Sequence, residues 1–151
     1  MKIDYDGNLI VAGTRYDEYK SQTNNGNYWI LKISNNNAEW LIIENDGNND
    51  EVVNFLLIDS DNNIYLSGKT KSKLYGEGNS NLNKGWYNGF LAKYDTDGNL
   101  IFGKQTEETG CWIAGNIDNI ELNDDKSEIT MLSNYNSEQK KYINRYNLDG
   151  E

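Results

Sequence analysis

The sequence of 151 residues predicts an all-β protein made of consecutive four-stranded antiparallel sheets. Short apolar runs alternate with turn clusters rich in Asp, Asn and Gly, which is the pattern of many short strands. No segment of about 11 residues or more keeps the 3.6-residue apolar period of a helix. Aromatic residues make up 12% of the chain, and this favours a folded domain over a disordered one.

The clearest single element is a β-hairpin between Phe90 and Phe102. An apolar run meets Asp95-Thr96-Asp97-Gly98-Asn99 and then resumes as a second apolar run. Gly98 can adopt the positive φ that a tight turn needs, and the Asp and Asn side chains can hydrogen-bond locally instead of extending a strand. Similar turns are expected at residues 4–8 and 59–63.

The remaining apolar runs predict strands along the whole chain, separated by polar turns or loops. In order, the ten expected strands are residues 9–12, 28–33, 39–43, 52–58, 64–68, 90–94, 100–102, 117–122, 128–132 and 142–146.

Two kinds of strand recur, and the second kind combines an aromatic residue with a basic one. The pairs are Trp29 with Lys32, Phe90 with Lys93, and Tyr142 with Arg145. Because the two positions lie on opposite faces of a strand, we expect the aromatic residue to point into a core and the basic residue outward. Four strands per roughly 50 to 65 residues indicate β-propeller blades. Residues 1–151 then form one domain with repeats at approximately 5–58, 59–122 and 123–151.

These motifs resemble the bacterial β-propeller repeat, whose better-known members form seven-bladed propellers. That repeat reads Gly-Asn-x-Tyr-Val-x-Gly, a variable loop, and then Phe-x-x-Lys-x-Asp-x-x-Gly-x-x-x-Trp. Residues 59–105 match it best, residues 5–43 match with the turn eroded to Ser34-Asn35-Asn36-Asn37, and residues 124–151 match weakly. The resemblance implies a fold but no catalytic residue, because the shared positions are structural.

Ten strands correspond to about two and a half blades, whereas closed propellers have four to eight. We therefore expect an incomplete propeller, which is either a fragment of a longer one or an open arc. A third possibility is a ring that several chains close together. An open arc would leave blade faces uncovered and favour self-association through them.

The acidic composition restricts the classes of partner. A formal net charge of −10 and a pI near 4.4 argue against nucleic acid and against anionic membrane surfaces. The basic cluster Lys69, Lys71 and Lys73 is interpreted as a solvated loop. The sequence shows no signal peptide and no apolar run long enough to insert in a membrane, so an exported location is expected only for a fragment of a longer protein, and a cytoplasmic one otherwise.

The residue types exclude several chemistries. Without histidine there is no Ser-His triad, and with the single cysteine Cys111 there is no intrachain disulfide, no zinc site and no expected cofactor. Cys111 is interpreted as a packing thiol. Asp95, Asp97 and Asn99 alternate as calcium ligands do, but the EF-hand positions for Gly and Glu hold Leu100 and Thr106, so turn capping is the preferred interpretation and no metal site is predicted.

A loop of variable length recurs at one place in every repeat, at residues 13–29, 68–90 and 133–142. Such insertions lie on one face of a repeat protein, often the binding face. The longest copy contains Trp86, Tyr87 and Asn88, which suit stacking on a sugar or packing on a protein. The alternative is that Trp86 and Tyr87 begin the next strand and pack inward.

The sequence therefore predicts a protein that is not an enzyme, a β-propeller module that binds a protein or glycan through its loop face. One alternative is a glycan hydrolase or lyase fragment that uses carboxylates, which would need two carboxyl groups from different repeats facing each other across a cleft. The adjacent acids at 50–51, 107–108 and 124–125 are interpreted as solvated turn residues. A purely structural repeat is the other alternative.

Overall fold

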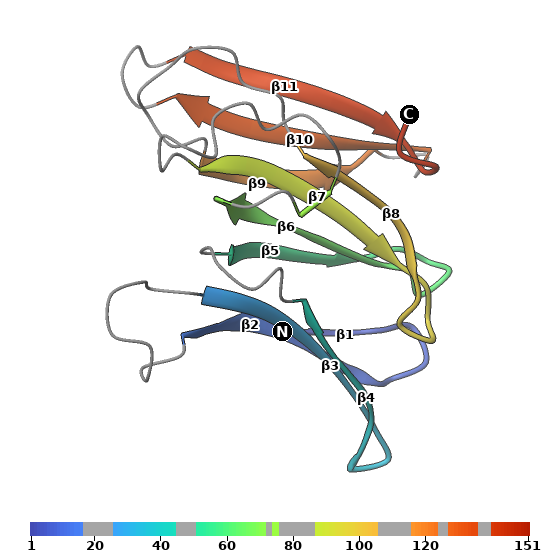
Figure 1. Cartoon of the computed structure of the whole chain (residues 1–151). Coiled ribbons are helices and arrows are strands. Elements are labelled where there is room, and N and C mark those ends of the chain that lie inside the picture. Colours follow the sequence, from blue (N-terminus) through green and yellow to red (C-terminus); the bar gives the residue numbers. More distant parts are fainter. Residues whose placement is uncertain are drawn as a thin grey trace.

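The computed structural model describes residues 1–16, 26–44, 51–71, 74–75, 87–105, 116–123, 127–135 and 140–151, which form strands and no helix (Figure 1). All ten predicted strands are confirmed. An eleventh, at the start of the chain, was missed because its two residues are too few to show a period. The strands are β1 Lys2–Ile3, β2 Leu9–Tyr16, β3 Gly26–Ser34, β4 Asn37–Glu44, β5 Glu51–Ile58, β6 Ile64–Thr70, β7 Asn88–Tyr94, β8 Leu100–Gln105, β9 Asn116–Leu122, β10 Glu128–Tyr135 and β11 Lys140–Asn147.

The strands form three antiparallel sheets in which chain neighbours are also sheet neighbours. Sheet 1 has the order β1-β2-β3-β4, sheet 2 has β5-β6-β7-β8, and sheet 3 has β9-β10-β11. The all-β prediction is thus confirmed. The sheets are out of phase with the sequence repeats by one strand, because β5 ends the repeat 5–58 but pairs with β6, and β9 ends the repeat 59–122 but pairs with β10.

The three sheets stack face to face, with sheet 2 in the middle (Figure 1). Every residue of β7 is buried, since both faces of sheet 2 are covered. The core between sheets 1 and 2 consists of Ile10, Tyr28, Ile30, Ile64, Leu66, Phe90, Ala92 and Tyr94. The core between sheets 2 and 3 consists of Tyr65, Leu91, Phe102, Ile120, Ile129 and Met131. Each large side chain buried in this way contributes roughly 1.5–3 kcal/mol.

For Lys93, this stacking corrects the expectation that the basic residue of an aromatic–basic strand points outward into solvent. Lys93 is only 7% exposed, because the face of β7 opposite Phe90 lies against sheet 3. Its ammonium donates a hydrogen bond to the carbonyl of Leu148 at 2.9 Å and lies 5.4 Å from the centre of the Tyr65 ring. The rule of alternating faces held, but both faces of this strand are interior.

Turns of one design lie at one end of the stack, here called the turn end. In the turn 95–99, Oδ1 of Asp95 accepts the N–H groups of Asp97 and Asn99 at 2.9 and 2.8 Å, and Oδ2 accepts the Asn99 amide at 2.8 Å. The fourth residue has positive φ, as predicted for Gly98 (φ 86°). The turns at 4–8, 59–63 and 147–151 repeat this geometry, with Gly7, Asn62 and Gly150 at the fourth position.

The structure contains no helix long and apolar enough to span a membrane within the residues it describes.

Candidate functional site

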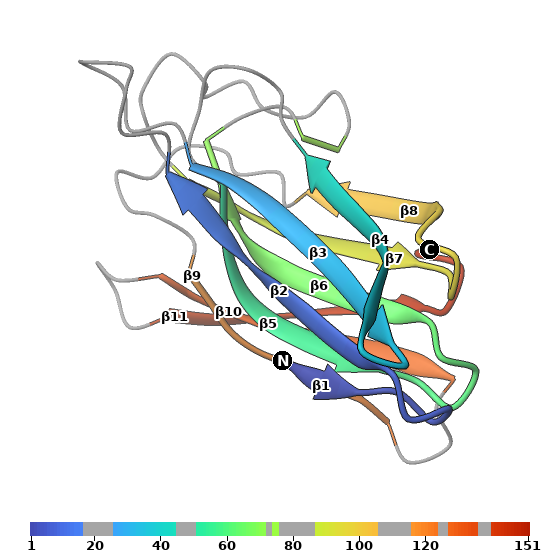
Figure 2. The ribbon, with the colours of Figure 1, turned by 90° about the horizontal axis from the view of Figure 1, so that it is seen from below.

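The strand ends opposite the turns form the second end of the stack, here called the loop end (Figure 2). Here β2, β6 and β10 finish, and β3, β7 and β11 begin, so the segments that vary in length between repeats all join strands at this end. Residues 17–25, 76–86 and 136–139 within those segments lie outside the described part of the chain. This group includes the predicted binding residue Trp86. Cys111 also lies outside it.

Tyr87 and Asn88 stand where β7 begins at the loop end. Tyr87 immediately precedes the strand and is half-buried. Asn88 is the first residue of β7, pairs with Thr70 of β6, and is only 2% exposed. Of these two predicted residues, Tyr87 is therefore the less buried one, while Asn88 lies in the interior.

Two lysine ammonium groups lie against the Tyr87 ring. Nζ of Lys69 is 4.6 Å and Nζ of Lys71 is 4.5 Å from the ring centre. Both distances are within the range of a cation–π interaction, which contributes about 0.5–1 kcal/mol at an exposed position. The interpretation of these lysines as a solvated loop was wrong for Lys69, which is a half-buried residue of β6. Lys73 lies outside the described residues.

A buried polar layer lies beneath this end of sheet 2. Glu51 of β5 is fully buried, and its Oε1 accepts a hydrogen bond from Thr70 Oγ1 at 3.2 Å. The interpretation of Glu51 as a solvated turn acid was therefore wrong, since it is the first residue of a strand. The other five acids of the three adjacent pairs lie outside the described residues. Nearby, Val53 N–H donates to Thr14 Oγ1 at 3.1 Å and links sheet 2 to sheet 1.

Three tyrosine hydroxyls meet between sheets 1 and 2. Tyr28 bonds to Tyr75 and, at 2.5 Å, to Tyr94, and Tyr75 and Tyr94 are 3.1 Å apart. Tyr94 also donates to Glu44 Oε1 at 3.4 Å. Burial raises the pKa of Tyr94 to about 12, and burial together with the neighbouring tyrosines raises the pKa of Tyr28 and Tyr75 further. At neutral pH the cluster is therefore a protonated structural network.

A shallow pocket of about 220 Å³ lies where β1 meets β5. Its lining consists of Lys2, Ile3, Asp4, Tyr5, Leu57 and Ile58. The single carboxylate among these residues, Asp4, accepts two N–H groups and one amide from its own turn. The described residues of this lining therefore do not supply the pair of facing carboxylates that glycoside hydrolysis needs.

The Asp-rich turns are capped by their own side chains. Both oxygens of Asp95 accept hydrogen bonds from the turn, as the preferred interpretation expected. Burial tends to raise the pKa of Asp95, but the hydrogen bonds from Asn99, Asp97 and Gly98 outweigh it and lower the pKa overall. Asn147 caps its turn in the same way without a charge. Among the described residues, no group of three potential metal ligands comes together.

No protein-family model matches this chain, and no curated protein matches it either.

Proposed function

We propose that the chain is a non-catalytic binding scaffold, an incomplete β-propeller whose three stacked sheets are its blades. Three features support this architecture: consecutive antiparallel strands in each sheet, face-to-face stacking, and the same turn at equivalent places. The resemblance of residues 59–105 to the bacterial propeller repeat adds to it. In this proposal β1, β5 and β9 are the inner strands of their blades.

The ligand site in this proposal is the loop end around Tyr87. The observation that carries it is the position of two ammonium groups over one half-buried ring, at the end of the stack where segment length varies. Two ammonium groups beside one aromatic ring suit a ligand that combines a ring or apolar face with acidic groups. An acidic oligosaccharide and an acidic segment of a protein both have this chemistry.

The test uses Tyr87→Leu and the double variant Lys69→Gln, Lys71→Gln. Binding of uronic-acid oligosaccharides and of a Glu-rich peptide carrying one aromatic residue is measured by calorimetry at low and moderate salt. We expect wild-type binding to at least one probe and a loss of at least about tenfold in affinity in both variants, equivalent to about 1.4 kcal/mol.

Lys2→Gln is the matched control, since it removes one positive charge from β1, which belongs to another sheet. It should bind as the wild type does. Equal weakening by Lys2→Gln would point to a general charge effect and contradict the proposed site. No binding of either acidic probe by the wild type would contradict it as well.

A further inference from the structure

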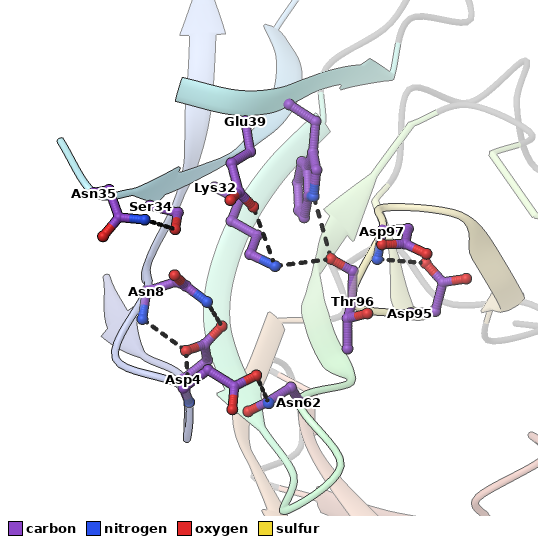
Figure 3. A network of polar contacts seen from close by, with 12 residues as sticks. Asp4, Asn8, Lys32, Ser34, Asn35, Glu39, Asn62, Asp95, Thr96 and Asp97 are labelled. Carbon is purple, nitrogen blue, oxygen red and sulfur yellow. Dashed lines mark hydrogen bonds and ion pairs between the residues drawn. The ribbon is translucent and has the colours of Figure 1, made fainter. Parts of the chain in front are cut away.

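A basic residue on the third strand of one sheet binds the turn of the next sheet, and this contact occurs twice. Lys32 of β3 donates to the carbonyl of Thr96 at 3.2 Å (Figure 3), and Lys93 of β7 donates to the carbonyl of Leu148 at 2.9 Å. Thr96 and Leu148 are each the second residue of their turns, 95–99 and 147–151. Thr96 lies three residues after Lys93, and Leu148 lies three residues after Arg145, so the two carbonyl groups occupy equivalent positions.

An aromatic residue accompanies each of these lysines and packs on the same turn. Trp40 is the register partner of Lys32, and Phe102 is that of Lys93. A Cβ added to Gly98 would lie 3.2 Å from the Trp40 ring, and one added to Gly150 would lie 2.7 Å from the Phe102 ring. The interfaces between sheets 1 and 2 and between sheets 2 and 3 thus use the same contacts.

Arg145 occupies the third position in this series. It pairs with Thr130 as Lys32 pairs with Ile10 and Lys93 with Tyr65. Its side chain is 68% exposed, and its ion pair with Glu128 is long, at 3.6 Å. Arg145 therefore lies on the open face of sheet 3, defined by Asn119, Glu121, Thr130, Leu132, Ile143 and Arg145.

The opposite side of the stack is an uncovered apolar face. Strand alternation and register place eight apolar side chains on the outer side of sheet 1. This apolar face consists of Ile3, Leu9, Val11, Trp29, Leu31, Ile33, Leu41 and Ile43. Ile3, Leu41 and Ile43 are 70%, 56% and 49% exposed.

The same positions in sheet 2 are the ones that sheet 1 covers. Leu9, Val11, Trp29, Leu31 and Ile33 correspond by register to Ile64, Leu66, Phe90, Ala92 and Tyr94. All five residues of sheet 2 are 0–1% exposed. The apolar face of sheet 1 is therefore the receiving half, and the open face of sheet 3 the donating half, of an interface that the chain already builds twice.

We propose that these two faces bind each other between two copies of the chain. The open face of sheet 3 in one copy covers the apolar face of sheet 1 in the next, and Arg145 donates to the carbonyl of Asn35 in the β3–β4 turn. Asn35 follows Lys32 by the same spacing as Thr96 follows Lys93 and Leu148 follows Arg145. Glu121 and Thr130 make the donating face more polar than its counterparts Leu57 and Tyr65, so the association is weaker than the contacts within one chain.

Such a contact joins two different surfaces, so it forms a closed ring or an open chain of copies. The proposal rests on the packing of the sheets and is independent of the ligand site at the loop end. Its test is sedimentation velocity over a wide range of concentrations, with Leu41→Glu blocking the apolar face and Arg145→Glu blocking the open face. Both side chains are exposed, so each variant should fold, and far-ultraviolet circular dichroism checks this.

The wild type should associate as its concentration rises, and each variant alone should associate at least about tenfold more weakly. An equal mixture of the two variants should form a dimer, because the Leu41→Glu copy keeps its open face and the Arg145→Glu copy keeps its apolar face. Leu100→Glu, which introduces the same charge at a 45% exposed position of β8, should associate like the wild type.

A wild type that remains monomeric throughout would overturn the proposal. So would association of Arg145→Glu at wild-type strength with no dimer in the mixture that contains both variants, because that result means that two apolar faces of sheet 1 bind each other symmetrically.

Discussion

The fourth residue of each Asx-capped turn carries a positive φ, but its surroundings differ between turns. Gly7 and Gly150 have the same φ of 85°, and an added Cβ would meet nothing within 4 Å at Gly7 but the Phe102 ring at 2.7 Å at Gly150. A comparison of substitutions at these two glycines therefore separates the cost of backbone strain from the cost of disturbed packing. Asn62 shows that an asparagine can occupy this position, at φ 62°.

We expect Gly7→Ala to lower the free energy of unfolding by about 1 kcal/mol, the strain of an L-residue with positive φ. Gly150→Ala should lower it by a larger amount, because the alanine must also displace Phe102. Urea denaturation followed by fluorescence measures both changes. Gly7→Asn is the control and should lie close to the wild type. Equal losses for the two alanine variants would show that Phe102 does not require a glycine beneath it.

At the scale of the elements, the lysines of β3 and β7 make the same contact, but the carbonyl groups that they bind differ in their other side-chain donors. The carbonyl of Thr96 accepts hydrogen bonds from both Lys32 and the Trp40 indole at 3.3 Å (Figure 3), whereas Lys93 is the side-chain donor to Leu148. Loss of Lys32 leaves Thr96 with a partner. Loss of Lys93 removes the side-chain donor from a contact between buried elements.

We expect Lys93→Met to lower the free energy of unfolding by about 1–3 kcal/mol, the range for losing a charged or buried hydrogen bond. Lys32→Met should cost less, since Trp40 remains. Chemical denaturation of the two variants under identical conditions tests this order. A greater loss for Lys32→Met would refute the role of the second donor.

The tyrosine cluster joins β3 to β7 and makes their packing sensitive to alkali. The pKa of Tyr94 is about 12 in the folded protein, above its ordinary value near 10, so the unfolded chain releases this proton first. The stabilisation is complete below pH 10 and is lost as the pH rises from 10 through 12. Tyr28 and Tyr75, with raised pKa values, act in the same direction.

The expected result is a urea midpoint that falls steeply above pH 10. The part of the tyrosinate absorbance that comes from the buried cluster should appear only together with unfolding. Tyr94→Phe removes one titrating group and should make the fall less steep. If tyrosinate formed fully while the protein stayed folded, the cluster would be open to solvent and the argument would fail.

On the scale of the whole molecule, the sequence predicted local structure well. The turn at Asp95–Asn99 and all ten strands came from residue type and spacing, because turn capping and strand periodicity depend on near neighbours. Packing between sheets was not predictable in the same way. The burial of Lys93 needs a second sheet more than fifty residues away in the chain, and strand alternation says only which side a residue is on.

In the candidate site, too, the local feature was predicted from the sequence and the contacts between strands were not. Tyr87 was selected from the sequence because it lies in a loop of variable length. Its contact with Lys69 and Lys71 was not foreseen, because it depends on the pairing of β6 with β7, in which Lys69 lies opposite Gly89. That register follows from aligning Ile64 with Tyr94 across the hairpin, so a strand-pairing argument could have found the contact.

The one-strand offset between repeats and sheets has a consequence for how such a chain can grow or be shortened. A gene duplication in the phase 5–58 delivers three strands to one sheet and the first strand, here β5, to the next. Each added copy is therefore tied to its predecessor by a complete hydrogen-bonded ladder as well as by the peptide chain. Ending the chain between residues 58 and 59 would remove β6 and leave β5 without its ladder partner. A truncation between residues 44 and 51, where one sheet ends and the next begins, would instead keep every ladder intact and remove only the packing between the two sheets.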